Sequence, residues 1–426
     1  MITKTVEKKT TLYIVLIFLS FSQIILECLG QNRITSALFY LSFVLLLYLW
    51  IVFADPSNRS YDNRVIVIAF LCVLNVFLEI YLDESSISLG AVKKIAFFVS
   101  CLMIYKISLD TLNVERIKKW CGIFALLCSA FFIVMYFTNR AAMYTRDHSW
   151  VSNYLTLNLG NPNKASLFIC VILFMDIIHF FSEKRIVRKL LFGVCAAFFI
   201  YFMIETQSRG GMLTLVAFGI AMLLFLRRKK VHIPKPLLFL FAVFPLVFSI
   251  LYLLTVNAVS LSGRFDFLVS EGKELSSRVD IWERAFSTIK DHWLIGGYSL
   301  LTDAGTGLYQ MHNTHVDVLA SFGIVVFMMY IHFLYRILRD LSSNKDLRFE
   351  NFYYFLAFAF MIVLGSSEAA VVNGTNGLPI LTAAFIAMSR QNAGDAITPD
   401  PTAEQNDPSS KATGFRARNR IANKYQ

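Results

Sequence analysis

Long apolar runs recur along most of this 426-residue chain, and they constrain its fold more than any other feature. A run of about 20 apolar residues is long enough to cross the roughly 30 Å hydrocarbon core of a bilayer as a helix, in which every backbone group is hydrogen-bonded internally. Hydrophobic residues make up 56% of the chain, with 40 Phe, and the mean hydropathy is +0.58. The sequence therefore predicts an all-α integral membrane protein.

Twelve such runs are separated by polar segments, and each is predicted to form a transmembrane helix. They cover residues 11–29, 34–53, 65–82, 91–109, 120–138, 165–181, 190–205, 211–226, 237–256, 316–335, 352–365 and 378–389. All seven cysteines fall within these runs without a Cys-x-x-Cys pair. We therefore expect the cysteines to pack as small hydrophobic residues of the core. The first run lacks a small-residue cleavage site and is expected to be retained rather than removed as a signal peptide.

The basic residues set the predicted orientation, because Lys and Arg are retained on the cytoplasmic side of a membrane. The larger share of them falls in loops on the side of the N-terminus. Twelve spans return the chain to that side, so both termini are predicted to be cytoplasmic. The net charge of +11 then mainly reflects the basic residues that orient the chain in the membrane. The sequence contains no motif that would contact bases in a nucleic-acid groove, so nucleic-acid binding is not predicted. Residues 1–390 are predicted to form the membrane domain, and residues 391–426 a disordered cytoplasmic tail.

Four polar segments are predicted to lie on the outer side of the membrane, opposite the cytoplasm. We expect the functional residues in these segments. They are residues 139–164, 205–211, 257–315 and 366–377. In the second segment, Arg209 lies between Ser208 and two glycines at a membrane interface. Snorkelling to water or lipid phosphate explains most such arginines. The paired glycines also permit close helix packing or a close approach to a ligand.

The third segment, residues 257–315, is predicted to be a long extracytoplasmic loop that contains short helices. Ser277 and Asp280 flank Arg278 in a pattern typical of a helix start. Arg278 would then lie on the first helical turn, where free backbone N–H groups and the helix dipole also favour an anion. In the alternative interpretation, Arg278 pairs with Asp280 or Glu283.

His312 closes this loop at the mouth of the next span, where an imidazole can accept a proton near neutral pH. His312, His315 and Asp317 have a spacing that would also suit a metal ion. No second pair of ligands is evident in the outer segments, so the sequence predicts neither a metal nor another cofactor.

Taken in order, these motifs resemble those of the O-antigen ligase and O-antigen polymerase family, over about residues 158–323. The matching residues are Asn158, Asn161 and Asn163 before a span, the turn Ser208-Arg209-Gly210, Ser277-Arg278 with Trp282, Gly296-Gly297, and His312-Asn313 with Leu319 and Gly323. Two departures concern details of the loop. Trp293 stands where relatives often carry Pro, and His315 stands at a site that is usually apolar or aromatic.

The resemblance implies a fold like that of the GT-C glycosyltransferases and inverting, metal-independent transfer of a glycan. The donor would be a polyprenyl diphosphate and the acceptor a sugar hydroxyl, on the outer face of the bacterial cytoplasmic membrane. Arg209 and Arg278 would stabilise the charge that develops on the diphosphate. His312 would take the proton of the attacking hydroxyl, with His315 as the alternative base.

Further residues would bind substrate or attract it. The expected substrate-binding residues are Asn161, Asn163, Ser208, Trp282, Asn313 and His315. Arg140, Arg146, Arg264 and Arg284 would widen the positive field around the diphosphate. The expected partners are the lipid-linked donor, a glycan or lipid-linked acceptor, the bilayer and other polysaccharide-assembly proteins.

Several activities remain open within the resemblance. We prefer a polymerase of surface polysaccharide, because polymerases occur in bacteria with or without an outer membrane. A ligase that transfers the glycan to lipopolysaccharide core is the alternative, and protein O-oligosaccharyltransferases form a third branch. A flippase for lipid-linked oligosaccharides or another transporter would also suit twelve spans. The predicted spans, however, contain few ionisable residues, mainly Glu79, Lys106 and Asp176.

Overall fold

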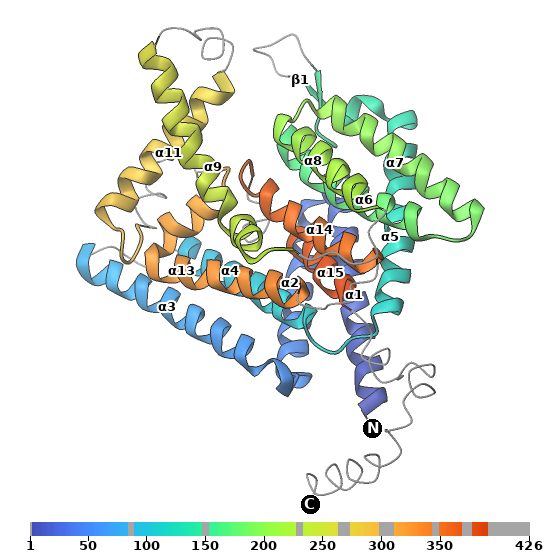
Figure 1. Ribbon diagram of the computed structural model, residues 1–426, viewed down its shortest axis with the longest axis horizontal. Coiled ribbons are helices and arrows are strands. Elements are labelled where there is room, and N and C mark those ends of the chain that lie inside the picture. Colours follow the sequence, from blue (N-terminus) through green and yellow to red (C-terminus); the bar gives the residue numbers. More distant parts are fainter. Residues whose placement is uncertain are drawn as a thin grey trace, which may run out of the picture. The chain divides into compact units, whose positions relative to one another are not determined.

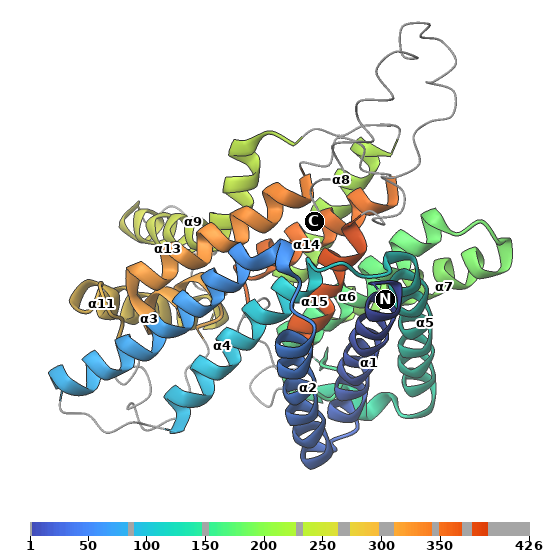
Figure 2. The same cartoon turned by 90° about the horizontal axis from the view of Figure 1, so that it is seen from below.

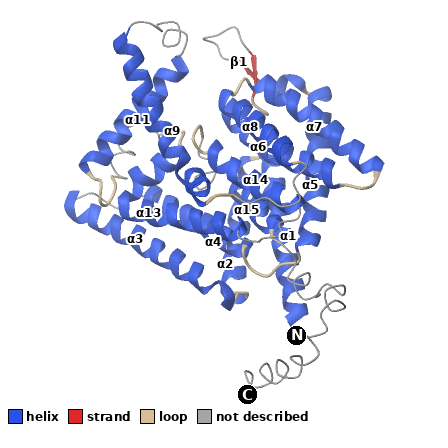
Figure 3. Cartoon of the chain, viewed as in Figure 1, coloured by secondary structure: helices blue, strands red, loops and turns tan. Residues whose placement is uncertain are grey.

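Nearly all of the described part of the chain is helical (Figure 3). The computed structural model describes residues 2–83, 89–146, 153–226, 233–262, 273–297, 311–342, 349–368 and 377–390. All of these belong to one unit, residues 1–390, whereas the predicted tail, residues 391–426, forms a second unit outside the described residues. Each of the twelve predicted apolar runs coincides with a helix, which confirms the all-α membrane class.

The twelve helices and the elements between them have the following bounds. The helices are α1 (Ile2–Cys28), α2 (Asn32–Val52), α3 (Arg59–Asp83), α4 (Leu89–Ser108), α5 (Val114–Thr138), α6 (Pro162–Ser182), α7 (Ile186–Thr206), α8 (Arg209–Phe225), α9 (Lys235–Ser262), α13 (Thr314–Ser342), α14 (Phe349–Leu364) and α15 (Leu378–Ser389). The other elements are the 3-10 turns η1 (Pro56–Asn58) and η2 (Arg140–Met143), the strands β1 (Tyr144–Arg146) and β2 (Asn153–Leu155), and helix α11 (Lys273–Asp291). The two strands pair antiparallel in the connection between α5 and α6.

Within the described residues, eight helices are long and apolar enough to cross a bilayer, namely α1, α2, α3, α5, α6, α7, α9 and α13. Helices α8, α14 and α15 are apolar but have only 17, 16 and 12 residues. Helix α4 has 20 residues and carries Lys93, Lys94 and Lys106. These four runs are present as helices, and their crossing of the membrane stays a prediction.

Helices α6, α14 and α15 lie near the centre of the bundle (Figures 1 and 2). Every residue of α6 from Ala165 to Asp176 is buried. Helices α5 and α7 lie on one side of this centre, and α3, α4, α9, α11 and α13 on the other. The outer helices α2, α3 and α7 carry many exposed Leu, Val and Phe side chains, as expected for surfaces that face lipid. All seven cysteines are buried and unpaired, which confirms their predicted role as core residues.

The alternating course of the helices gathers one set of helix ends at what we call the predicted outer end. There Lys164, at the start of α6, forms an ion pair of 2.5 Å with Glu27 at the end of α1. The Asn158 side chain donates a hydrogen bond to the backbone carbonyl of Cys28 (2.8 Å). These contacts fix the start of α6 beside the end of α1.

Helix α13 is broken at Gly323, which has φ +73° and ψ 178°. The segment that follows α11 pairs with this break, since Gly297 N–H donates to Ala320 C=O and Ile324 N–H donates to Trp293 C=O, both at 2.9 Å. A Cβ atom on Gly323 would lie 2.2 Å from the carbonyl oxygen of Leu294. The glycine is therefore required by both its backbone angle and the approach of a second backbone.

Candidate active site

His312 lies just before Asn313, the residue that precedes α13, with its Nδ1 2.8 Å from Oε1 of Glu368. The side chain of His312 is 22% exposed and that of Glu368 7%. A carboxylate only accepts hydrogen bonds, so in a neutral imidazole the proton resides on Nδ1 and the lone pair on Nε2. His312 is thus arranged to accept a proton at Nε2.

The backbone at His312 has φ +46°, which is uncommon for a residue other than glycine. The next residues attach it to the turn after α14. Thr314 N–H donates to Gly365 C=O (2.9 Å), and the Thr314 hydroxyl donates to Glu368 C=O (3.3 Å). These bonds hold the unusual conformation in place.

Asn313 is fully buried and caps α13. Its Oδ1 accepts hydrogen bonds from the N–H groups of His315 (2.9 Å) and Val316 (3.1 Å). Its Nδ2 donates to Pro245 C=O in α9 (2.7 Å) and lies 3.4 Å from Ser366 C=O. The predicted substrate residue Asn313 therefore joins three parts of the fold beside His312.

Trp282 is also buried, and its indole N–H donates to Met311 C=O (2.7 Å). Its ring packs edge-on against Tyr252 in α9, with centroids 5.6 Å apart. Since Met311 precedes His312, Trp282 fixes the approach of the chain to the candidate base.

The other predicted base and the alternative metal site are arranged differently from His312. His315 is fully buried, and its Nε2 lies 2.7 Å from Ala242 C=O in α9. Its imidazole therefore faces the protein interior. Asp317 pairs with Lys94 Nζ at 2.6 Å. His312, His315 and Asp317 thus have three separate partners, and the described residues contain no group of three His, Cys, Asp or Glu side chains that could hold a metal ion.

On the other side of the site, Ser208 caps α8 and is buried. Its hydroxyl donates to Asn163 Oδ1 (2.9 Å) and lies 3.0 Å from Ser166 Oγ. Asn161 caps α6 by accepting from the N–H groups of Asn163 (2.8 Å) and Lys164 (3.4 Å). Three of the predicted substrate residues therefore also fix the ends of α6 and α8.

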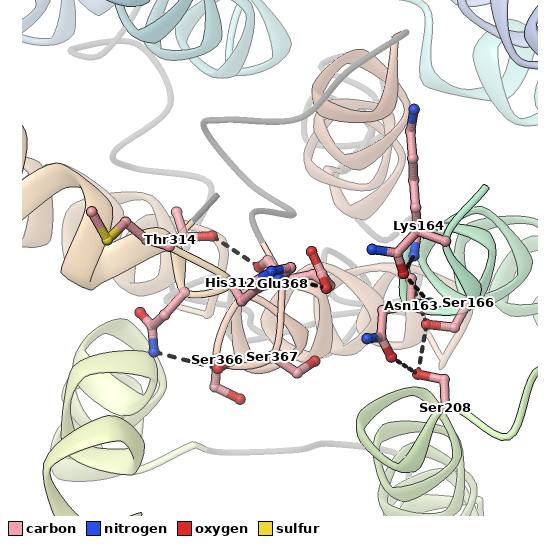
Figure 4. Close-up of polar contacts among 12 residues, drawn as sticks. Asn163, Lys164, Ser166, Ser208, His312, Thr314, Ser366, Ser367 and Glu368 are labelled. Carbon is pink, nitrogen blue, oxygen red and sulfur yellow. Dashed lines mark hydrogen bonds and ion pairs between the residues drawn. The ribbon is translucent and has the colours of Figure 1, made fainter. Parts of the chain in front are cut away.

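Arg209 is the first residue of α8 and is exposed, without an ion pair among the residues that the structure describes. The residue after it, Gly210, touches the turn after α14: a Cβ atom there would lie 2.5 Å from Ser367 Oγ. Figure 4 shows Ser367 and Glu368 between His312 and the hydrogen-bonded residues Asn163, Ser166 and Ser208. The turn after α14 thus joins the Arg209 turn to the candidate base.

The structure corrects one detail of the loop around Arg278. The predicted helix start at Ser277 is wrong, because α11 begins at Lys273, four residues earlier. Lys273, Glu274 and Leu275 are all good helix formers, so nothing stops the helix from starting before the serine. Arg278 is therefore not on the first turn of α11, and its side chain lies outside the part that the structure describes.

The four other predicted arginines are spread over the chain. Arg140 lies over the rings of Tyr136 and Tyr144, 4.9 and 5.4 Å from their centroids. Burial raises the pKa of Tyr144 to about 12, so its hydroxyl stays protonated and donates to Glu205 (3.0 Å). Arg284 is exposed on α11. The side chain of Arg146 and all of Arg264 fall outside the described part.

Sequence reasoning assigned no role to Glu368. The segment 366–377 was predicted to lie on the outer side, and Glu368 is the one charged residue in it. This lone carboxylate at the end of an apolar run was the available signal. Its partner His312 is 56 residues away in the sequence, and no spacing rule connects the two.

Comparisons with known proteins confirm the predicted resemblance. Residues 191–331 match the family described as O-antigen ligase. The chain is also similar to the ComP-specific O-oligosaccharyltransferase of Acinetobacter baylyi (strain ATCC 33305 / BD413 / ADP1), with 22% identity over 334 residues. That alignment covers 71% of this chain and 59% of the relative, so the chain spans less than two thirds of the relative's length. The family match includes Arg209, Arg278 and His312 and ends within α13.

Proposed function

We propose that this chain, which carries the O-antigen ligase family match at residues 191–331, transfers a glycan from a polyprenyl diphosphate to an acceptor hydroxyl. The observation that carries the proposal is the shared turn at the predicted outer end. The turn after α14 contacts Gly210, next to Arg209, and bonds His312 through Glu368. One segment thus joins a cationic turn and a proton acceptor.

In the proposed reaction, the acceptor oxygen attacks C1 of the donor sugar while its proton moves to Nε2 of His312. The new C1–O bond forms as the bond from C1 to the phosphate oxygen breaks. The electron pair of that bond leaves with the polyprenyl diphosphate, on the side opposite the attack, so the configuration at C1 is inverted. Arg209 and Arg278 would offset the developing charge through bidentate hydrogen bonds.

A lipid-linked donor suits the location of these groups. Arg209 begins an apolar helix and His312 precedes another, so both lie where a helix leaves its apolar environment. A polyprenyl tail can then remain among the helices and lipid while its diphosphate meets the arginines. We place this end on the outer face of the bacterial cytoplasmic membrane, with both chain termini in the cytoplasm, on the basis of the basic loops.

The preferred activity is that of a polysaccharide polymerase, with an O-antigen ligase as the alternative. The name of the Acinetobacter relative adds an O-oligosaccharyltransferase as a third possibility for the acceptor. The three differ in the molecule that supplies the hydroxyl, while the donor chemistry at Arg209, Arg278 and His312 is shared. The acceptor is therefore what the first experiment must distinguish.

The experiment incubates the purified full-length protein with a polyprenyl diphosphate-linked repeat unit, in the presence of a chelator, and resolves the products by length. A ladder of longer lipid-linked chains identifies a polymerase. Product formed only after lipopolysaccharide core is added identifies a ligase, and product formed only with a protein acceptor identifies an oligosaccharyltransferase. Donor that crosses a liposome membrane without forming product with any acceptor would contradict the enzyme and indicate a transporter.

The variants His312→Ala, Arg209→Ala and Arg278→Ala should each lose product. Loss of a general base typically costs about 10²–10⁴-fold in rate. Arg188→Ala is the matched control, because Arg188 is exposed at the opposite end of α7 from the Arg209 turn. Full activity of His312→Ala would remove this residue from the proposed mechanism.

A further inference from the structure

We infer that Glu368 is the positioning residue of the candidate base, an inference that rests on the proposed function. Glu368 would fix the proton of His312 on Nδ1 and so present the Nε2 lone pair to the acceptor. Their side chains are bonded at 2.8 Å, and Glu368 is almost fully buried. Glu368 also lies outside residues 191–331, so the family match says nothing about it.

Hydrogen bonds of both the backbone and the side chain fix the position of Glu368. Its carbonyl accepts the Thr314 hydroxyl, and its N–H group donates to Leu364 C=O at 3.3 Å, which closes the turn after α14. The carboxylate then reaches back to His312. A buried carboxylate is costly unless it is paired, and the imidazole of His312 provides such a pairing.

The backbone of His312 points to the same conclusion. A non-glycine residue at φ +46° is strained and persists only where the surroundings enforce it. Thr314 and Asn313 enforce it through the turn that carries Glu368. The enforced backbone conformation therefore orients the His312 imidazole toward the Glu368 carboxylate.

The pairing has a chemical consequence for the transfer step. When the acceptor proton moves to Nε2, the imidazole becomes a cation with both nitrogens protonated. The carboxylate of Glu368 stabilises that cation through the Nδ1–H bond, which is already formed. The proton count is unchanged: one proton leaves the acceptor hydroxyl and one arrives at Nε2, while Glu368 stays ionised.

The test compares kcat and KM of the full-length protein for the lipid-linked donor in wild type, Glu368→Gln, Glu368→Asp, His312→Ala and the double variant His312→Ala/Glu368→Gln. In Glu368→Gln the amide can donate to Nδ1 and so permit the wrong tautomer. We expect kcat to fall by at least about tenfold with KM nearly unchanged; the analogous Asp→Asn change in the serine protease triad costs about 10⁴. The double variant should be no slower than His312→Ala, because Glu368 acts through His312.

Glu368→Asp keeps the carboxylate and should recover part of kcat, while thermal midpoints report the folding of each variant. A wild-type kcat in Glu368→Gln, alongside an inactive His312→Ala, would overturn the role of Glu368 and leave the proposed function intact. An active His312→Ala would instead overturn the proposed function. Additive losses in the double variant, or a Glu368→Asp variant that folds normally but is as slow as Glu368→Gln, would also contradict positioning through His312.

Discussion

Gly210 is the residue at which the Arg209 turn meets the turn after α14. A Cβ atom there would lie 2.5 Å from Ser367 Oγ and 2.8 Å from its Cβ, whereas a Cβ atom on Gly219, in the same helix, would meet nothing within 4 Å. Gly210→Ala must push Ser367 and Glu368 away, and such overpacking typically costs about 1–3 kcal/mol.

We therefore predict that Gly210→Ala lowers both the thermal midpoint and the rate of glycan transfer. Gly219→Ala should leave the rate unchanged and the midpoint unchanged or raised, because Ala is the better helix former. Thermal unfolding in detergent and the product assay measure the two effects. Equal behaviour of the two variants would show that the Gly210 contact does not matter.

The amide of Asn313 makes a second residue-scale prediction, for stability alone. Asn313→Asp keeps the cap of α13 but removes the donors to Pro245 C=O and Ser366 C=O, and it buries a charge. We expect a loss of about 1–3 kcal/mol. Asn161→Asp is the matched control, since among the described residues the Asn161 side chain accepts from N–H groups and donates to none, and Asp caps a helix as well as Asn. Denaturant unfolding should separate the two variants; similar stabilities would mean that the two donated bonds contribute little.

At the scale of elements, the break in α13 depends on one glycine. Gly323 and Gly30 have the same φ of +73°, but a Cβ atom on Gly30 would meet nothing within 4 Å, and one on Gly323 would collide with the backbone at Leu294. Gly30→Ala thus measures the cost of a positive φ without a collision, about 1–2 kcal/mol. Gly323→Ala should cost clearly more and should abolish transfer, because the displaced segment leads from α11 to His312. Thermal midpoints within one degree of each other would show that the collision is relieved without cost.

The sequence predicted all eight described helices that are long and apolar enough to cross a bilayer, because a run of apolar residues reports directly on the hydropathy that such a helix requires. It predicted helix ends less well, because helices such as α9 and α13 continue past the apolar runs into more polar sequence, where hydropathy carries no signal. The site was predicted in part. Alternation along the chain placed Arg209 and His312 in segments on one predicted side, but their connection through Glu368 depends on packing between α8, α13 and α14. A pattern along the chain does not encode that packing.

At the scale of the whole molecule, the end of the bundle opposite the site is held by buried charges. Lys106 is fully buried and pairs with Asp62 (2.9 Å) and Asp110 (3.5 Å), and Lys9 also pairs with Asp110 (2.7 Å). These residues join α1, α3 and α4. Arg390, which follows α15, donates to the backbone carbonyl of Asp110 at 2.5 Å and to that of Leu109. The last described residue is therefore part of this network.

This network predicts where the chain can be shortened. Residues 391–426 form a unit of their own, so a protein that ends at Arg390 should keep its thermal midpoint and its glycan transfer. Arg390→Ala in the full-length chain should instead lose about 1–3 kcal/mol, because two buried carbonyls lose a charged donor. The two proteins are compared by thermal unfolding and by the product assay. A shortened protein that is less stable than Arg390→Ala would show that residues 391–426 support the membrane domain, which the separation of the two units does not predict.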